Sequence, residues 1–344
     1  KKNCMQAGYE DPHTHVKCNS YGLEACMEKG REFIRWDEKR KEYENQTGPV
    51  RKGIGMAIFC YKTGVYPISL ETAACRMILN QDGSMQLQMG ATEIGQGADA
   101  VTPFDTGAYA SRQTYVSGMA VKKTGAVLKE KILDYGAYML GRPQDTLDIE
   151  ANYVVDQETR QQLLSMEELA TTAFYSLDRS VHITAEATSH CKINTFATGV
   201  CFAEVEVDMP LGKVKVTNIV NVHDSGTLIN PKLAAAQVHG GMSMGLGYGL
   251  SEELLFDAKG RPLNDNLLDY KLPTAMDTPD LNALFVELDD PTGPFGNKAL
   301  GEPPAIPVAP AVRNAVLNAT GVAVDSLPMD PQKMVKHFKE AGLI

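Results

Sequence analysis

The stretch Gly199–Asp224, GVCFAEVEVDMPLGKVKVTNIVNVHD, decides the fold class of this chain. It contains two runs in which apolar and polar side chains alternate, a pattern typical of β-strands with one buried face. Pro210, Leu211 and Gly212 separate the two runs and have the composition of a tight turn. The stretch therefore predicts a β-hairpin.

A similar alternating pattern is found from Arg51 onward, in the segments GIGMAIFCY, ACRMILNQ and SMQLQMG. Residues 80–83 (NQDG), between the last two segments, have the composition of a hairpin turn. Apolar periodicity and breaker residues predict helices at residues 22–45, 112–141, 232–250 and 308–319. Each alternating block is followed by helices. We therefore expect an α+β fold with two mixed α+β lobes, residues 51–195 and 196–344, after a helical lead at residues 1–50.

The composition of the chain excludes some classes of protein and favours others. The chain has 344 residues, of which 43% are hydrophobic, and it can bury a large core. Its formal net charge of -10 disfavours nucleic-acid binding. Without an apolar run of about 20 residues or an apolar stretch near its start, it is expected to be a soluble cytoplasmic protein with no membrane contact. Its seven cysteines form no CxxC pair, so they predict small buried groups rather than disulfides or a metal site.

The stretch Gly90–Gly97, GATEIGQG, follows a predicted strand and holds three glycines. Its spacing differs from the GxGxxG of dinucleotide folds, and no P-loop lysine follows. The residues alone leave two interpretations open, a turn that ends the strand or a loop that approaches a ligand.

The stretch Asp105–Gly118, DTGAYASRQTYVSG, places small and hydroxyl residues just before a long predicted helix. Backbone N–H groups near Ser111 could bind an anion at the helix N-terminus. The alternative is an ordinary helix start that is capped by Ser111 or Thr106.

The predicted helix at residues 232–250 contains Gln237 and five glycines, which each cost about 1 kcal/mol of helix propensity. Tight packing against another backbone or against a planar cofactor would explain them. His223 and His239 lack ligand-spaced partners, so we expect them to be hydrogen-bonded structural groups.

The stretch Ala299–Val316, ALGEPPAIPVAPAVRNAV, places Glu302 before two prolines and an apolar helix. A partly buried carboxylate in this position could serve as a general base near neutral pH. The alternative is that Glu302 complements the helix dipole.

These stretches occur together, in order, in one known family. The chain resembles the C-terminal half of the molybdenum-binding subunit of bacterial xanthine dehydrogenases. The resemblance is carried by the stretches GLEACMEKGREF, VRKGIGMA, GATEIGQGAD, VTPFDTGAYASRQ, NVHDSGTLINP, NLLDYKLPT and LGEPPAIP. These dehydrogenases belong to the xanthine oxidase and aldehyde oxidase family of molybdenum hydroxylases. The resemblance implies lobes of the molybdenum-cofactor-binding type.

The resemblance also implies a site and an activity. The metal would be held through the dithiolene of molybdopterin rather than by protein ligands. Glu302 would be the general base for hydroxylation of xanthine, hypoxanthine or a similar N-heterocycle, with oxygen drawn from water. A 2Fe-2S cluster and FAD on partner subunits would take the electrons, with NAD as final acceptor, in a complex expected to be dimeric. The implied cofactor contacts are Gln96, Gly97, Ala110, Ser111, Arg112, Gln113 and Gln237.

Two departures from the family accompany the resemblance. The Gly-Gly-Phe-Gly loop and other substrate-pocket residues belong to an upstream half, so this chain alone does not close an active site. The family usually has a further helix and strand where Ala100 here joins Val101 directly. Two alternatives stay open, a sister hydroxylase acting on nicotinate or an aldehyde, and a non-catalytic half-subunit that binds molybdopterin.

Overall fold

The computed structural model describes residues 4–13, 15–93 and 103–344. The chain forms two compact units. Unit 1 combines Lys1–Thr63 with Thr195–Ile344, and unit 2 is the continuous segment Gly64–Asn194. Each unit has its own sheets and helices, and the two are described separately below.

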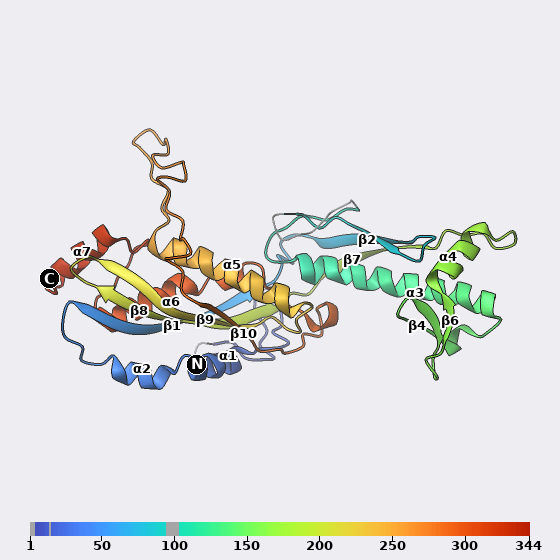
Figure 1. Ribbon diagram of the computed structural model, residues 1–344, viewed down its shortest axis with the longest axis horizontal. Helices are drawn as coiled ribbons and strands as arrows, with labels where there is room; N and C mark the ends of the chain where they lie inside the picture. Colours follow the sequence, from blue (N-terminus) through green and yellow to red (C-terminus); the bar gives the residue numbers. More distant parts are fainter. Residues whose placement is uncertain (1–3, 14, 94–102) are drawn as a thin grey trace. The chain divides into compact units, whose positions relative to one another are not determined.

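A four-stranded sheet forms the centre of unit 1 (Figure 1). Its strands are β1 (Val50–Lys62), β8 (Phe196–Asp208), β9 (Lys213–Asp224) and β10 (Leu281–Phe285), in the order β1-β8-β9-β10. The pairs β1–β8 and β8–β9 are antiparallel, and β10 runs parallel to β9. The hairpin predicted from the alternating block is therefore confirmed as β8 and β9.

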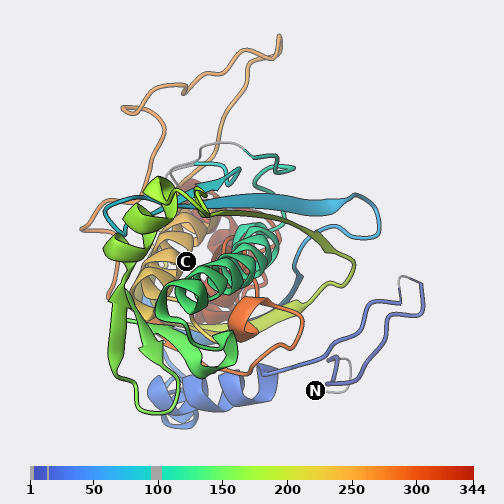
Figure 2. The ribbon, with the colours of Figure 1, turned by 90° about the vertical axis from the view of Figure 1, so that its right-hand side faces the viewer.

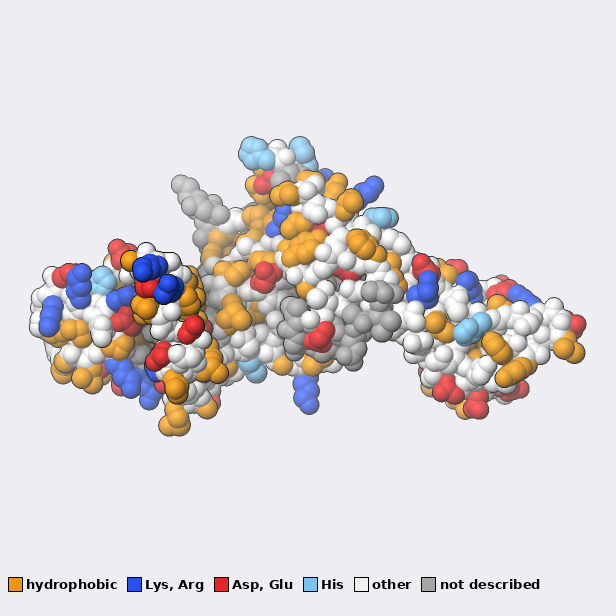
Figure 3. All heavy atoms as spheres, turned by 90° about the horizontal axis from the view of Figure 1, so that it is seen from above, with side chains coloured by type: hydrophobic (Ala, Val, Ile, Leu, Met, Phe, Trp, Pro, Cys, Tyr) orange, Lys and Arg blue, Asp and Glu red, His pale blue; other side chains and the backbone are white. Residues whose placement is uncertain are grey.

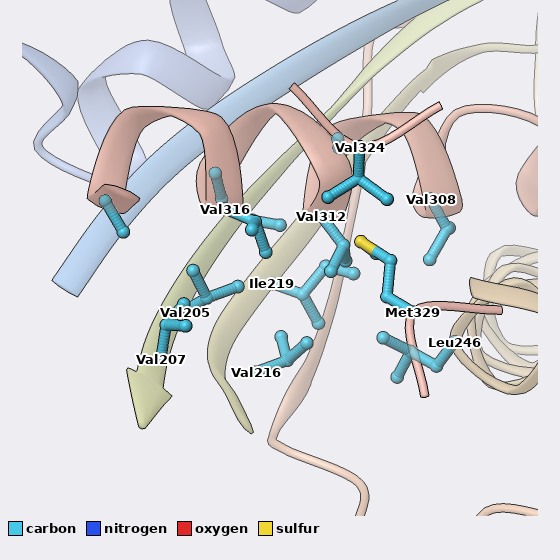
Figure 4. Close-up of a cluster of buried hydrophobic side chains, with 14 of the residues drawn as sticks. Val205, Val207, Val216, Ile219, Leu246, Val308, Val312, Val316, Val324 and Met329 are labelled. Atoms are coloured by element: carbon cyan, nitrogen blue, oxygen red, sulfur yellow. The ribbon is translucent and has the colours of Figure 1, made fainter. Parts of the chain in front are cut away.

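Helices cover both faces of this sheet. On one face α5 (Pro231–Leu250), α6 (Val308–Thr320) and α7 (Pro331–Glu340) enclose the main core, in which valines of α6 pack on Val205, Val216 and Ile219 of the strands (Figure 4). A methyl group added at Gly53 would lie 2.1 Å from the carbonyl oxygen of Ala315, so α6 lies directly on the backbone of β1. The helices predicted at residues 232–250 and 308–319 are confirmed, whereas α7 was not predicted.

The other face of the sheet is covered by α1 (Leu23–Phe33) and α2 (Trp36–Glu42). The single helix predicted at residues 22–45 is wrong, because Arg35 adopts a left-handed φ of 58° that ends one helix and starts the next. This break lets Ile34 enter the core and sets Trp36 edge-on to Phe202, with 5.5 Å between ring centroids.

In its described residues, unit 2 contains two small sheets and two helices (Figure 2). Strands β2 (Glu71–Leu79), β3 (Met85–Met89) and β7 (Thr184–Cys191) form a sheet in the order β3-β2-β7, and α3 (Gly118–Leu140) packs on it. The turn predicted at residues 80–83 joins β2 to β3 and is confirmed. The second sheet contains β4 (Leu147–Glu150), β5 (Tyr153–Asp156) and β6 (Gln162–Ser165), followed by α4 (Met166–Tyr175).

The bounds of the units differ from the predicted lobes. Residues 51–62 were assigned to the first lobe, but as β1 they pair with β8 along their whole length, from Val50 opposite Asp208 to Lys62 opposite Phe196. The helical lead also belongs to unit 1, because α1 packs on β8 and β9. The join near residue 195 agrees with the predicted boundary, but the chain crosses between the units twice.

An excursion at residues 252–280 leaves unit 1 between α5 and β10, and is the orange loop at the top of Figure 1. It exposes large apolar side chains, among them Leu267, Leu268 and Met276. Hydrophobic and charged side chains lie side by side at its end (Figure 3). In the part of the chain that the structure describes, no helix is both long and apolar enough to cross a membrane.

Candidate active site and cofactor-binding residues

Glu302 lies in the connection that leads into α6. A single 3-10 turn, η4 (Pro303–Ala305), follows it. Pro303 and Pro304 are buried, whereas the Glu302 side chain is exposed. The prediction of a partly buried carboxylate is therefore wrong for this chain: the prolines anchor the segment in the core, and the charged group avoids the cost of desolvation by remaining at the surface.

The glycines of α5 explain how this connection packs so closely. A methyl group added at Gly241 would lie 2.5 Å from the Cβ of Pro304, and one at Gly245 would lie 2.6 Å from the Cβ of Val308. Close packing of the helix on another backbone segment, one of the two explanations proposed from the sequence, is thus confirmed for these two positions. Gly240 is different, because nothing lies within 4 Å of an added methyl group there.

Three side chains hold the segment around Glu302. Gln237 of α5 donates from Nε2 to the carbonyl of Gly301 over 2.9 Å, and Asn221 of β9 donates from Nδ2 to the carbonyl of Pro304 over 2.9 Å. The hydroxyl of Tyr61, near the end of β1, donates to Oε2 of Glu302. The structure therefore brings together Gln237 and Glu302, which lie 65 positions apart in the sequence.

Tyr61 and Asn221 were not predicted as site residues. The sequence indicates only the face of β1 on which Tyr61 lies. Tyr61 follows Phe59 by two positions, and side chains two positions apart in a strand point to the same face. Asn221 interrupts the apolar run Ile219, Val220 and Val222 near the end of β9, and a polar residue in a buried strand needs a hydrogen-bond partner.

His223, on β9, is fully buried. Its ring lies between Phe59 and Phe285, with centroid distances of 5.0 and 6.4 Å. Burial lowers the pKa of His223 to about 3, because the apolar surroundings disfavour its charged form. Neither ring nitrogen of His223 has a hydrogen-bond partner within the described residues. The expectation of a hydrogen-bonded group is therefore wrong for His223, and for His239 it stays a prediction.

The second group of predicted residues lies in unit 2, at the start of α3. Ala110 and Ser111 both have positive φ, 46° and 50°. A π-helical turn, η1 (Gln113–Ser117), then leads into α3, and neither element has a side-chain cap. Capping by Ser111 or Thr106 is therefore wrong. Left-handed backbone at residues other than glycine is costly, and such strain is often found where a chain contacts a ligand.

Arg112 is fully buried, and its guanidinium points into unit 2. It forms ion pairs with Glu71 and Asp105 and donates to the carbonyls of Gly107 at 2.8 Å and Thr72 at 3.0 Å. Burial opposes its charge, but the two carboxylates more than compensate and raise the pKa of Arg112 above its usual value. Its side chain thus fixes the loop from inside, and its backbone N–H donates to the carbonyl of Tyr109 over 3.2 Å. The cofactor contact that the resemblance implies for Arg112 stays a prediction.

Gln113 connects the start of α3 to the glycine-rich stretch Gly90–Gly97. Its Nε2 donates to the carbonyl of Thr92 over 2.8 Å. Gln96 and Gly97 lie outside the described residues, and their predicted contacts stay predictions. The predicted residues thus fall into two groups, one in each unit: Ala110, Ser111, Arg112 and Gln113 in unit 2, and Gln237 and Glu302 in unit 1.

Comparison with known proteins places these features in a family. The chain is 43% identical to the putative xanthine dehydrogenase molybdenum-binding subunit of Escherichia coli (strain K12), over all of this chain and 49% of that protein. It is 32% identical to the probable hypoxanthine oxidase of the same organism, over 92% of this chain and 35% of that protein. The chain thus spans half or less of the length of these relatives.

The fold is also found in solved structures. Quinoline 2-oxidoreductase from Pseudomonas putida 86 matches with a TM-score of 0.87 at 21% identity, over 97% of this chain and 48% of that chain.

The alignment with the 43% identical relative covers 371 positions, more than the 344 residues here, so this chain lacks part of the relative's aligned region. The molybdopterin cofactor-binding domain family matches residues 29–102 and 98–279, in two pieces that overlap around the junction of Ala100 and Val101. The chain belongs to the molybdopterin cofactor-binding domain family.

Proposed function

We propose that this chain is the part of a molybdenum hydroxylase that holds molybdopterin and supplies the general base. The enzyme would oxidise xanthine, hypoxanthine or a similar N-heterocycle, with water as the oxygen source. The observation that carries the proposal is the position of Glu302, whose neighbouring carbonyl at Gly301 is held by Gln237, a residue proposed to contact the cofactor. The names of the relatives, a xanthine dehydrogenase subunit and a hypoxanthine oxidase, support the choice of substrate class.

The residues present fit an organic cofactor that is bound through amides and backbone groups. Gln237 is exposed and uses Nε2 toward Gly301, which leaves its Oε1 able to accept a hydrogen bond from a pterin. Gly240 lies about one turn further along α5 and leaves open space at its Cα, where a planar group could approach the helix backbone. In unit 2, the left-handed residues Ala110 and Ser111 present a strained backbone ahead of α3, suited to the anionic end of the cofactor.

Arg112, Gln113, Gln96 and Gly97 complete the proposed cofactor contacts. Arg112 would hold the loop in the shape that the cofactor needs, since its side chain is paired with Glu71 and Asp105. Gln113 links the start of α3 to Thr92, just before the stretch that contains Gln96 and Gly97. When bound, the molybdenum centre supplies the two-electron oxidation, and no residue of this chain needs to be a direct metal ligand.

Glu302 accepts a proton in this scheme. Its exposed carboxylate is accessible to a group bound outside the chain, and two buried prolines fix the backbone on its C-terminal side. The tether from Gln237 fixes the backbone on its N-terminal side. A carboxylate on such a rigid support can be aimed at one proton, which general-base catalysis requires.

The proposal includes partners. Electrons leave through a 2Fe-2S cluster and FAD on other subunits, and NAD is the final acceptor. The name of one relative, a molybdenum-binding subunit, supports a multi-subunit complex. We propose that the complex is a dimer in the cytoplasm, where NAD is available. With a net charge of -10, the chain is not expected to bind nucleic acid.

Replacing Glu302 by Gln in the complete enzyme tests the proposal. The change keeps the shape and the hydrogen bond from Tyr61 but removes the base, so turnover of xanthine and hypoxanthine should fall about 100- to 10,000-fold. Bound molybdenum and pterin should stay unchanged. The matched control is Glu252→Gln, because Glu252 also accepts a tyrosine hydroxyl, that of Tyr270 at 2.9 Å. Full activity of Glu302→Gln, or nicotinate turnover that exceeds that of both purines, would contradict the proposal.

A further inference from the structure

We infer that Tyr61 is a positioning residue for Glu302, and that it sets the orientation from which the carboxylate takes its proton. The inference rests on the proposed function of Glu302. It assigns a role to a residue that the motifs around Glu302 do not contain, since Tyr61 lies on β1, 241 positions earlier in the chain.

The backbone of Tyr61 is fixed by the sheet. Tyr61 lies opposite Ala197 near the end of the β1–β8 ladder, and the next pair, Lys62 opposite Phe196, still belongs to it. Beyond the strands, the N–H of Thr63 donates to the carbonyl of Thr195 over 2.9 Å. A side chain that starts from a paired strand position has little backbone freedom, so its hydroxyl is held at a defined point.

The side chain of Glu302, in contrast, is long and exposed. A glutamate has three side-chain torsions, and an exposed one samples several rotamers. The hydroxyl of Tyr61 donates to Oε2. A hydrogen bond to an ionised acceptor is stronger than one between neutral groups, so it selects one carboxylate orientation from the rotamers available.

The selected orientation matters because a general base acts only within hydrogen-bond reach of its proton. Without the tyrosine hydroxyl, the carboxylate remains present and charged but spends less time in the productive orientation. Turnover then falls in proportion to the lost population, while substrate binding by the rest of the site is kept. This split between kcat and KM distinguishes positioning from a purely structural role.

The first test is Tyr61→Phe in the complete enzyme, which removes one oxygen atom and keeps the ring. We expect kcat for xanthine to fall about 10-fold or more, with KM, bound molybdenum and melting temperature unchanged. The matched control is Tyr270→Phe, which removes the same kind of hydrogen bond from Glu252 and should leave kcat unchanged. An unchanged kcat in Tyr61→Phe overturns the inference.

A double-mutant cycle provides the second test. If Tyr61 acts only through Glu302, then Tyr61→Phe should have no further effect on the residual turnover of Glu302→Ala, because no carboxylate remains to be positioned. Additive losses would show that Tyr61 acts elsewhere and overturn the inference. The two proposals fail separately. Full activity of Glu302→Gln contradicts the base itself, whereas loss of activity there combined with an unaffected Tyr61→Phe contradicts only the positioning role.

Discussion

Two neighbouring glycines on α5 should respond in opposite directions to the same substitution. Gly241→Ala and Gly240→Ala both gain about 1 kcal/mol of helix propensity. At Gly241 the new methyl group would lie 2.5 Å from the Cβ of Pro304 and 3.1 Å from the backbone nitrogen of Ala305, so the packed segment must move. Overpacking of this kind costs about 1 to 3 kcal/mol. At Gly240 nothing lies within 4 Å, so the gain is kept.

The propensity gain is common to both variants and cancels in their comparison, so Gly240→Ala should be about 1 to 3 kcal/mol more stable than Gly241→Ala. Trp36 is the one tryptophan in the sequence and contacts Phe202 in unit 1, so its fluorescence follows the urea unfolding of this unit. Gly241→Ala should also lower turnover, because Pro304 carries the strain to the segment of Glu302. Equal midpoints for the two variants would refute the reasoning.

Two further predictions concern buried ionisable side chains. Because burial lowers the pKa of His223 to about 3, the unfolded chain binds a proton below about pH 6.5 that the native chain does not, and stability falls by about 1.4 kcal/mol per pH unit as the pH drops. His223→Leu should remove this loss, so its melting temperature should fall less steeply than that of the parent between about pH 6 and 4, and parallel curves would contradict the assignment. Arg112→Met leaves Glu71 and Asp105 buried without their cation and should destabilise unit 2 by about 3 to 5 kcal/mol in denaturant unfolding. A loss below about 1 kcal/mol would show that the carboxylates find other partners.

Local features were predictable from the sequence where short-range chemistry determines them. The turns at residues 80–83 and 210–212 contain residues that favour tight turns, and both join the predicted strands. α3 ends at Leu140 and is followed by Gly141, which adopts the left-handed conformation that glycine tolerates, as its position before Pro143 indicates. The glycines of α5 indicate close packing, although they do not indicate which segment packs on them.

Features that depend on distant partners were not predictable. Alternation identified β1 as a strand but not β8 as its neighbour, so the predicted lobes divided a sheet that is continuous in the structure. Arginine is usually a surface residue. The burial of Arg112 depends on its ion pairs with Asp105 and with Glu71, which lies 41 positions away. The apolar neighbours of Glu302 suggested burial, but periodicity does not tell whether a carboxylate shares the burial of the prolines beside it.

The division of unit 1 into two chain segments has a consequence for synthesis on the ribosome. β1 ends at Lys62, but its only strand partner in the described sheet, β8, is complete only at Asp208. At about 5 to 20 residues per second, β1 stays unpaired for roughly 7 to 30 s before β8 has been synthesised. Unit 2 is continuous and can fold during this interval. A nascent chain stalled between these points should therefore carry a folded unit 2 and an unpaired β1, and this is the stage at which chaperone binding would protect the protein from aggregation.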